Sequence, residues 1–172
     1  IYGLPGGNTG AQMGGWFRKE INSVDDLKGV RMRIPGLGGA TLAKLGVEPV
    51  QLTGAEAAAK LAAGEIDAAE WVAPFDDLGL GFHKAAAYYY HPGWWDGCGT
   101  VHLFIALDKW NALPKAYQAI VTAAAARANA TMQARYDVSA PAALATLLAA
   151  GTQLRTFPGP VLEACFAAAN EV

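Results

Sequence analysis

Four short segments of the chain place polar side chains directly after expected strands or within glycine-rich turns. They contribute the guanidinium of Arg33, the amide of Gln12 and the carboxylates of Glu70 and Asp96. Ligands of an open α/β sheet bind outside the carboxyl ends of its strands, so these four groups can meet at one site. Because arginine binds a carboxylate through a planar pair of donors, Arg33 is the expected anchor for a small anionic ligand.

Two arginines end the first clear strand. Arg31 and Arg33 are two residues apart and therefore share a face of that strand. We expect one of them to be solvated and the deeper one to bind the ligand. The alternative for Arg33 is an ordinary salt bridge at the surface.

The charges of this set indicate a cation. Glu70 follows a buried strand, where an unpaired carboxylate is costly. An anionic ligand, Glu70 and Asp96 carry three negative charges against one positive charge from Arg33, and they repel each other unless a cation joins them or one acid stays protonated. Oxygen ligands, including the amide of Gln12, favour sodium or calcium over zinc. The alternative for both acids is a salt bridge at the rim of the sheet.

Aromatic residues accompany these segments and could wall the site against water. They are Trp16, Trp71, Trp94, Trp95 and the run Tyr88-Tyr89-Tyr90. The alternative for most of them is ordinary core packing.

The other reactive residue types form no recognisable motif. The histidines, at positions 83, 91 and 102, lack the spacing of metal ligands. Cys98 and Cys165 are far apart in sequence, so they are either ordinary thiols or a disulfide. The glycine-rich turn at 36–39 lacks the third glycine of a dinucleotide-binding motif because Thr41 stands there.

The composition favours a globular domain. Hydrophobic residues make up 53% of the 172 residues, which is enough for a sizeable core. The formal net charge is -2 and no run of basic residues is present, which argues against nucleic acid as a partner. The opening residues read like the interior of a domain, and we expect a fragment cut at both ends.

The expected elements alternate between strands and helices up to residue 107. Strands are expected at 30–34, 48–52, 66–69, 85–90 and 101–107, and helices at 38–45 and 54–64, with a short turn or helix at 74–80. This alternation predicts an α/β fold with a parallel-rich sheet covered by helices. The last strand is apolar nearly throughout, which predicts that it is buried. Two capping boxes, Ser23 to Asp26 and Thr53 to Glu56, predict helix starts.

After Leu113-Pro114 the chain becomes rich in alanine, which predicts one long helix. Its packed face is expected at positions 113, 117, 120, 124, 128, 131 and 135. Pro141 should kink or end it. A second helix at 142–150, a strand at 154–157 and a last helix at 161–169 follow.

The joint pattern resembles a known family of proteins. The segments that carry the resemblance are GNTGAQMGGWF (7–17), VRMRIPGLGGATLAKLGVEPVQL (30–52), GEIDAAEWVAPFDD (64–77), YYYHPGW (88–94) and the helix after LDKWNALPKAYQAI (107–120). They are similar to the periplasmic solute-binding proteins of TRAP transporters. Within that family the chain resembles the subgroup that binds 2-oxo acids such as pyruvate, or hydroxy acids such as lactate.

The resemblance implies a periplasmic-binding-protein type II-like fold of two α/β lobes, bridged by a long helix. It implies a ligand-binding lobe at 1–107, and at 108–172 the bridging helix with C-terminal helices that pack on the other lobe, most of which is missing. In the family, the arginine matching Arg33 pairs with the substrate carboxylate. The residues matching Gln12, Glu70 and Trp71 surround a metal ion, and Asp96 would complete that shell. Asn8 and Trp95 are further expected contacts of the substrate.

The resemblance also implies a role as a binding protein and not a catalyst. The ligand would be a small monocarboxylate held with a sodium or calcium ion and no organic cofactor. The partners would be the TRAP membrane subunits in the periplasm, and members of this subgroup can form homodimers. The alternative is a metal-assisted α/β enzyme in which Glu70 or Asp96 is a general base. A structural domain without a ligand is a third reading.

Overall fold

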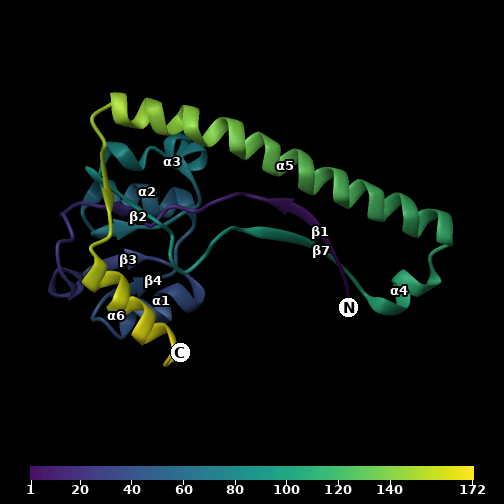
Figure 1. Ribbon diagram of the computed structural model, residues 1–172, viewed down its shortest axis with the longest axis horizontal. Helices are drawn as coiled ribbons and strands as arrows, with labels where there is room; N and C mark the ends of the chain where they lie inside the picture. Colours follow the sequence, from purple (N-terminus) through teal and green to yellow (C-terminus); the bar gives the residue numbers. More distant parts are fainter.

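The computed structural model describes all residues from 1 to 172 (Figure 1). A body built on a six-stranded sheet holds most of the elements, and a long arm extends from it. The arm contains a two-stranded ribbon, helix α4 (Leu107–Ala112) and much of helix α5 (Lys115–Ala149). No helix combines the length and apolar character needed to cross a membrane.

The sheet of the body is mixed. Its strands, in spatial order, are β4 (Glu48–Val50), β3 (Arg31–Arg33), β5 (Ala68–Ala69), β2 (Gly15–Phe17), β6 (Tyr88–His91) and β8 (Gln153–Thr156). Strand β3 pairs in parallel with β4 and β5, and β6 pairs in parallel with β8. Strand β2 is antiparallel to both of its neighbours. The predicted α/β fold with a largely parallel sheet is confirmed, although β2 was not expected from the sequence.

The helices of the body begin close to the predicted positions, except that the 3₁₀ turn η2 was not predicted. They are η1 (Val24–Leu27), α1 (Gly36–Ala43), α2 (Gly54–Ala63), α3 (Pro74–Leu80), η2 (Phe82–Lys84) and α6 (Gly159–Ala169). The capping box at α2 is confirmed, since the Thr53 N–H donates to Glu56 Oε2 at 2.9 Å and the Glu56 N–H donates to Thr53 Oγ1 at 3.4 Å. At η1, the Ser23 N–H donates to Asp26 Oδ2 at 2.8 Å, and the segment forms a 3₁₀ turn.

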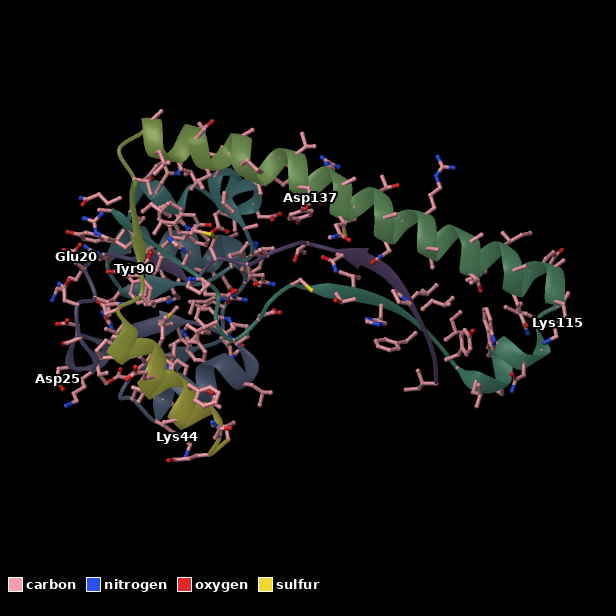
Figure 2. All side chains as sticks on the ribbon, viewed as in Figure 1. Glu20, Asp25, Lys44, Tyr90, Lys115 and Asp137 are labelled. Carbon is pink, nitrogen blue, oxygen red and sulfur yellow. The ribbon has the colours of Figure 1, made fainter.

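Two apolar clusters form the core of the body, where Figure 2 shows the side chains crowded together. One surrounds Met32, Ile34 and Phe157, and contacts α1 and α6. The other surrounds Trp16 and Tyr89, which are fully buried. Trp16 and Tyr89 therefore pack in the core, which was the alternative prediction for most of the aromatic residues.

The prediction that the strand near 101–107 is buried is wrong. Strand β7 (Thr100–Ile105) pairs only with β1 (Tyr2–Asn8), in an antiparallel ribbon, and Phe104 is 68% exposed. The face of the ribbon that is covered packs on α5. An apolar run indicates that a strand can be buried, but it does not indicate whether another element packs on that strand.

The long helix is confirmed, but two details of it are wrong. Helix α5 runs for 35 residues and continues through Pro141, so the two expected helices are one. Pro141 is exposed and removes a single backbone donor, and the turns on either side continue the helix. The expected packed face is also wrong, because Tyr117 and Ile120 are exposed, while Val121 and Ala125 pack on the ribbon and α4. Alanine occurs on every face of this helix, so periodicity does not single out one of them.

After α5 the chain returns to the body. Strand β8 pairs with β6, and α6 packs against α1 and η1. The strand expected at 154–157 and the helix expected at 161–169 are thereby confirmed to within two residues. The division into a lobe of 1–107 and a helical part of 108–172 stays a prediction.

Candidate functional site

Arg33 is the less exposed arginine of the pair that ends β3. Arg31 is exposed and its Nε lies 3.5 Å from Asp67, whereas the Arg33 side chain is only 12% exposed. The Arg33 Nε donates to the Leu52 carbonyl at 3.1 Å. Its Nη1 donates to both the carbonyl and the Oε2 of Glu70, at 2.6 and 3.0 Å. The Nη2 atom has no hydrogen-bond partner within the protein.

Glu70 is a buried carboxylate directly after β5. Its side chain is 5% exposed, and Arg33 is its only basic partner. Burial raises the pKa of Glu70 to about 7, because Arg33 opposes the shift less strongly than burial and the nearby acids Asp77 and Asp96 favour it. A cation close to Glu70 would remove this penalty.

Gln12 and Asp96 meet beside this ion pair. The Gln12 Nε2 donates to Asp96 Oδ2 at 3.0 Å, and the Gln12 carbonyl accepts the Gly93 N–H at 3.1 Å. Met13, the residue after Gln12, donates its N–H to the Val72 carbonyl at 3.1 Å, which holds the Gln12 segment beside the segment of Glu70. The fold therefore gathers the groups that the sequence separates by as many as 84 positions.

Trp71 covers the guanidinium. The Cζ of Arg33 lies 4.5 Å from the centroid of the indole ring, a cation–π arrangement. The ring also packs on the start of α2 at Gly54. Trp71 thus restricts Arg33 on one face and limits the access of water to it.

Asn8 lies at the border of the cluster. Its Oδ1 accepts the Gly10 N–H at 2.7 Å, and its Nδ2 approaches the Sγ of Cys98 at 3.6 Å. The Cys98 N–H in turn donates to Asp96 Oδ1 at 3.2 Å. Asn8 therefore shapes the turn next to Asp96 and makes no contact with Arg33. Both cysteines are free thiols.

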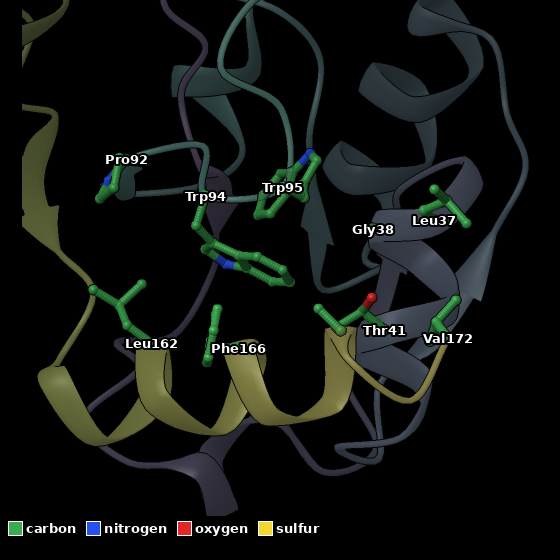
Figure 3. Close-up of a pocket in the computed structure, with 10 residues that line it drawn as sticks. Leu37, Gly38, Thr41, Pro92, Trp94, Trp95, Leu162, Phe166 and Val172 are labelled. Carbon is green, nitrogen blue, oxygen red and sulfur yellow. The ribbon is translucent and has the colours of Figure 1, made fainter.

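Trp95 faces α1 and not Arg33. Its ring packs on Gly38 and forms an edge-to-face pair with Trp94, with ring centroids 5.0 Å apart. Both rings line a cavity of about 500 Å³ between α1 and α6, shown in Figure 3. None of the charged residues of the cluster reaches this cavity, and its apolar lining does not suit a small carboxylate.

The oxygen atoms of the cluster fit a hard cation. Glu70 and Asp96 supply carboxylates, and Oε1 of Glu70 and Oε1 of Gln12 have no hydrogen-bond partner. Sodium and calcium take such oxygen ligands. No group of three or more His, Cys, Asp or Glu side chains is placed to hold a metal, so the amide of Gln12 and backbone or ligand oxygens would have to contribute.

Asp77 is a further residue of this region, and it is not among the site residues predicted from the sequence. It is 1% exposed, and its charge acts on Glu70. The only hint in the sequence is a pair of acids, Asp76 and Asp77, within a short apolar helix. Its role depends on contacts with residues far away in the chain.

A model of one protein family matches residues 3–172 of the chain. The family is the DctP family, described as bacterial extracellular solute-binding proteins, family 7. The chain belongs to the DctP family.

Individual relatives agree with this membership. A monocarboxylate 2-oxoacid-binding periplasmic protein from Nostoc sp. is 51% identical over 164 residues, which are 95% of this chain and 45% of that protein. A TRAP periplasmic solute-binding protein from Colwellia psychrerythraea, solved with bound calcium and pyruvate, is 46% identical with a TM-score of 0.92. One from Pseudoalteromonas atlantica, solved with bound sodium and pyruvate, is 43% identical with a TM-score of 0.89. Each of these two structures is matched over 98% of this chain and 52% of its own.

This DctP-family chain therefore spans about half the length of the relatives it matches. The match confirms the family that the sequence pattern indicates, together with its fold. It also shows that an α/β body with a long helix is shared with solved binding proteins of this family.

Proposed function

We propose that the full-length protein captures a small 2-oxo acid, such as pyruvate, together with a cation in the periplasm. It then presents both to the membrane subunits of a TRAP transporter. The observation that carries this proposal is the partly buried Arg33, held by Glu70, Leu52 and Trp71 with one nitrogen, Nη2, left without a partner. A guanidinium that is held in place and keeps free donors in a partly buried site is a specific partner for one carboxylate group.

The cation would be held by Glu70, Asp96 and Gln12, with Trp71 alongside. Two carboxylates and a ligand anion, set against Arg33, leave two negative charges, which a divalent ion neutralises and a sodium ion does not. This count favours calcium. A cation at this position would screen the carboxylates from each other and bind the second oxygen of the ligand.

Binding without catalysis is the better reading of the site. A general base would need a proton-transfer partner near the reacting carbon. Glu70 and Asp96 are instead paired with Arg33 and Gln12. Relatives that are 51% and 46% identical over the matched residues are described as binding proteins, which supports the same conclusion.

A calorimetric titration of pyruvate into the full-length protein tests the proposal. After chelation, we expect little or no binding. Addition of calcium should restore affinity in the micromolar range or tighter, and sodium should restore less. Mass spectrometry of the mixture should show unchanged pyruvate.

Two variants refine the test. Asp96→Asn removes one carboxylate and should shift the preference from calcium toward sodium, whereas Asp25→Asn, an exposed acid of η1 paired with Lys28, should change nothing. Pyruvate binding that ignores cations, or turnover of the bound acid, would contradict the proposal.

A further inference from the structure

Asp77 is a buried carboxylate with three donors and no basic partner. It lies in α3, and its Oδ2 accepts the indole N–H of Trp16 at 2.9 Å and the hydroxyl of Tyr89 at 2.7 Å. Its Oδ1 accepts the backbone N–H of Val72 at 3.4 Å. No lysine, arginine or histidine forms an ion pair with it, although it is 1% exposed. A buried acid without a cation is expensive, so this arrangement calls for a reason.

The two side-chain donors form one rigid unit in the middle of the sheet. The rings of Trp16 and Tyr89 are stacked with centroids 4.0 Å apart, and both residues are fully buried. Trp16 lies opposite Tyr89 on one side and opposite Ala69 on the other. Asp77 is therefore tied to β2, which pairs with β5 just before Glu70, and to β6 on the other side of β2.

The backbone donor connects Asp77 to both halves of the proposed cation site. Val72 ends the Glu70-Trp71-Val72 turn, so its N–H fixes that turn to α3. The Val72 carbonyl accepts the N–H of Met13 at 3.1 Å, and Met13 directly follows Gln12. The backbone of Val72 thus joins the segment of Glu70 to the segment of Gln12 through its carbonyl, and it is held by Asp77 through its N–H.

We propose that Asp77 is a positioning residue of the cation site. Trp16 and Tyr89 hold the carboxylate in place, and the carboxylate in turn holds the backbone of Val72 through the Val72 N–H. Its negative charge adds to the attraction of the site for a cation. This inference rests on the proposed function. It extends that function to a residue that touches neither the ligand nor the ion.

The competing explanation is that Asp77 merely accepts hydrogen bonds inside the core. In that case its loss would lower stability without a selective effect on the cation. The neighbouring residue provides a matched comparison, since Asp76 accepts the hydroxyl of Tyr136 at 3.1 Å from α5. Asp76 and Asp77 are adjacent in the same helix, and each holds a tyrosine, but only Asp77 contacts the Val72 peptide.

The experiment compares four variants of the full-length protein. Asp77→Asn removes the charge and keeps the shape of the side chain, and Tyr89→Phe removes one donor and leaves the carboxyl group in place. Their controls are Asp76→Asn and Tyr136→Phe. For each we would measure the melting temperature and, by calorimetry, the affinity for calcium alone and for pyruvate at saturating calcium. Tyr89→Phe keeps the proposal testable if Asp77→Asn fails to fold.

We expect Asp77→Asn to weaken calcium binding by about 10- to 100-fold, the range found for residues that orient metal ligands without binding the ion themselves. Tyr89→Phe should weaken calcium binding by about threefold, since it removes one hydrogen bond of ordinary strength. The two controls should keep the calcium affinity of the wild type even where their melting temperatures fall. Wild-type affinity in Asp77→Asn, or in Tyr89→Phe if Asp77→Asn does not fold, would overturn the proposal. Equal losses in the controls would overturn it as well.

The two proposals fail in different ways. If the wild-type protein binds no pyruvate with any cation, the proposed function is wrong, whatever the variants do. If the wild type binds as expected and only the contrast between Asp77 and Asp76 is absent, the positioning role alone is wrong.

Discussion

Gly54 leaves the space that the indole of Trp71 occupies. A methyl group at Gly54 would lie 3.0 Å from Cζ2 of Trp71 and 3.0 Å from Cδ1 of Leu80. Both distances are shorter than ordinary carbon–carbon contacts, so a side chain here must push the ring or the helix away. Since Trp71 lies over Arg33, the first residue of α2 and the proposed anchor of the ligand are coupled through one ring.

The substitution Gly54→Ala should therefore weaken pyruvate binding. A displaced ring no longer holds the guanidinium, and we expect a loss of about tenfold, which corresponds to about 1.4 kcal/mol. Gly79→Ala is the control, because nothing lies within 4 Å of a side chain added there. That change should leave the affinity intact and, as a helix substitution, stabilise the protein by up to ~1 kcal/mol. Calorimetry and thermal melting measure both, and equal affinities for the two variants would refute the coupling.

Replacement of Arg33 by lysine tests the anchor. The planar guanidinium of arginine can donate to Leu52, to Glu70 and to a ligand carboxylate at the same time. The compact ammonium group of lysine cannot reach all three. We expect Arg33→Lys to weaken pyruvate binding by about 30- to 100-fold, or about 2–3 kcal/mol. Arg31→Lys, which alters the exposed partner of Asp67 on the same strand, should change the affinity less than twofold. A similar loss in both variants would mean that Arg33 acts only through general charge.

The pH dependence of stability should reveal the raised pKa of Glu70. Its pKa is raised from 4.5 to about 7, mainly by burial, so between these values the folded chain holds a proton that the unfolded chain has released. The free energy of unfolding therefore falls as the pH rises through this window. At about 1.4 kcal/mol per pKa unit, we expect the cation-free wild type to lose roughly 2–3 kcal/mol between pH 5 and pH 8, relative to Glu70→Gln.

Urea denaturation of both proteins at a series of pH values, in the presence of a chelator, measures this difference. The Glu70→Gln protein is the reference that removes the contributions of all other groups. Calcium should reduce the loss in the wild type, because a bound cation favours the ionised carboxylate. Parallel curves for the two proteins would show that Glu70 titrates normally.

The cap of α2 makes a prediction about stability alone. Thr53→Ala removes the hydroxyl that accepts the Glu56 N–H and should lower the free energy of unfolding by about 1 kcal/mol. Thr53→Ser keeps the hydroxyl and should lower it by no more than a few tenths of a kcal/mol. Denaturant titrations give both values. A loss as large in the serine variant would assign the effect to the methyl group and not to the cap.

The sequence predicts the local elements of this chain well because their signals are local. The cap at Thr53, the strand of Arg31 to Arg33 and the long alanine-rich helix all come from neighbouring residues. It also predicts the residues that meet around Glu70, because polar groups at strand ends converge when the strands share a sheet. The family follows from the joint pattern of these segments.

The tertiary structure decides which surface each element buries. The apolar run of β7 lies in an exposed ribbon, helix α5 packs with a face other than the expected one, and Trp95 turns toward α1. These outcomes depend on contacts between segments that are distant in the chain, which periodicity does not record. The same holds for Asp77, whose partners Trp16 and Tyr89 become neighbours only when β2 inserts between β5 and β6.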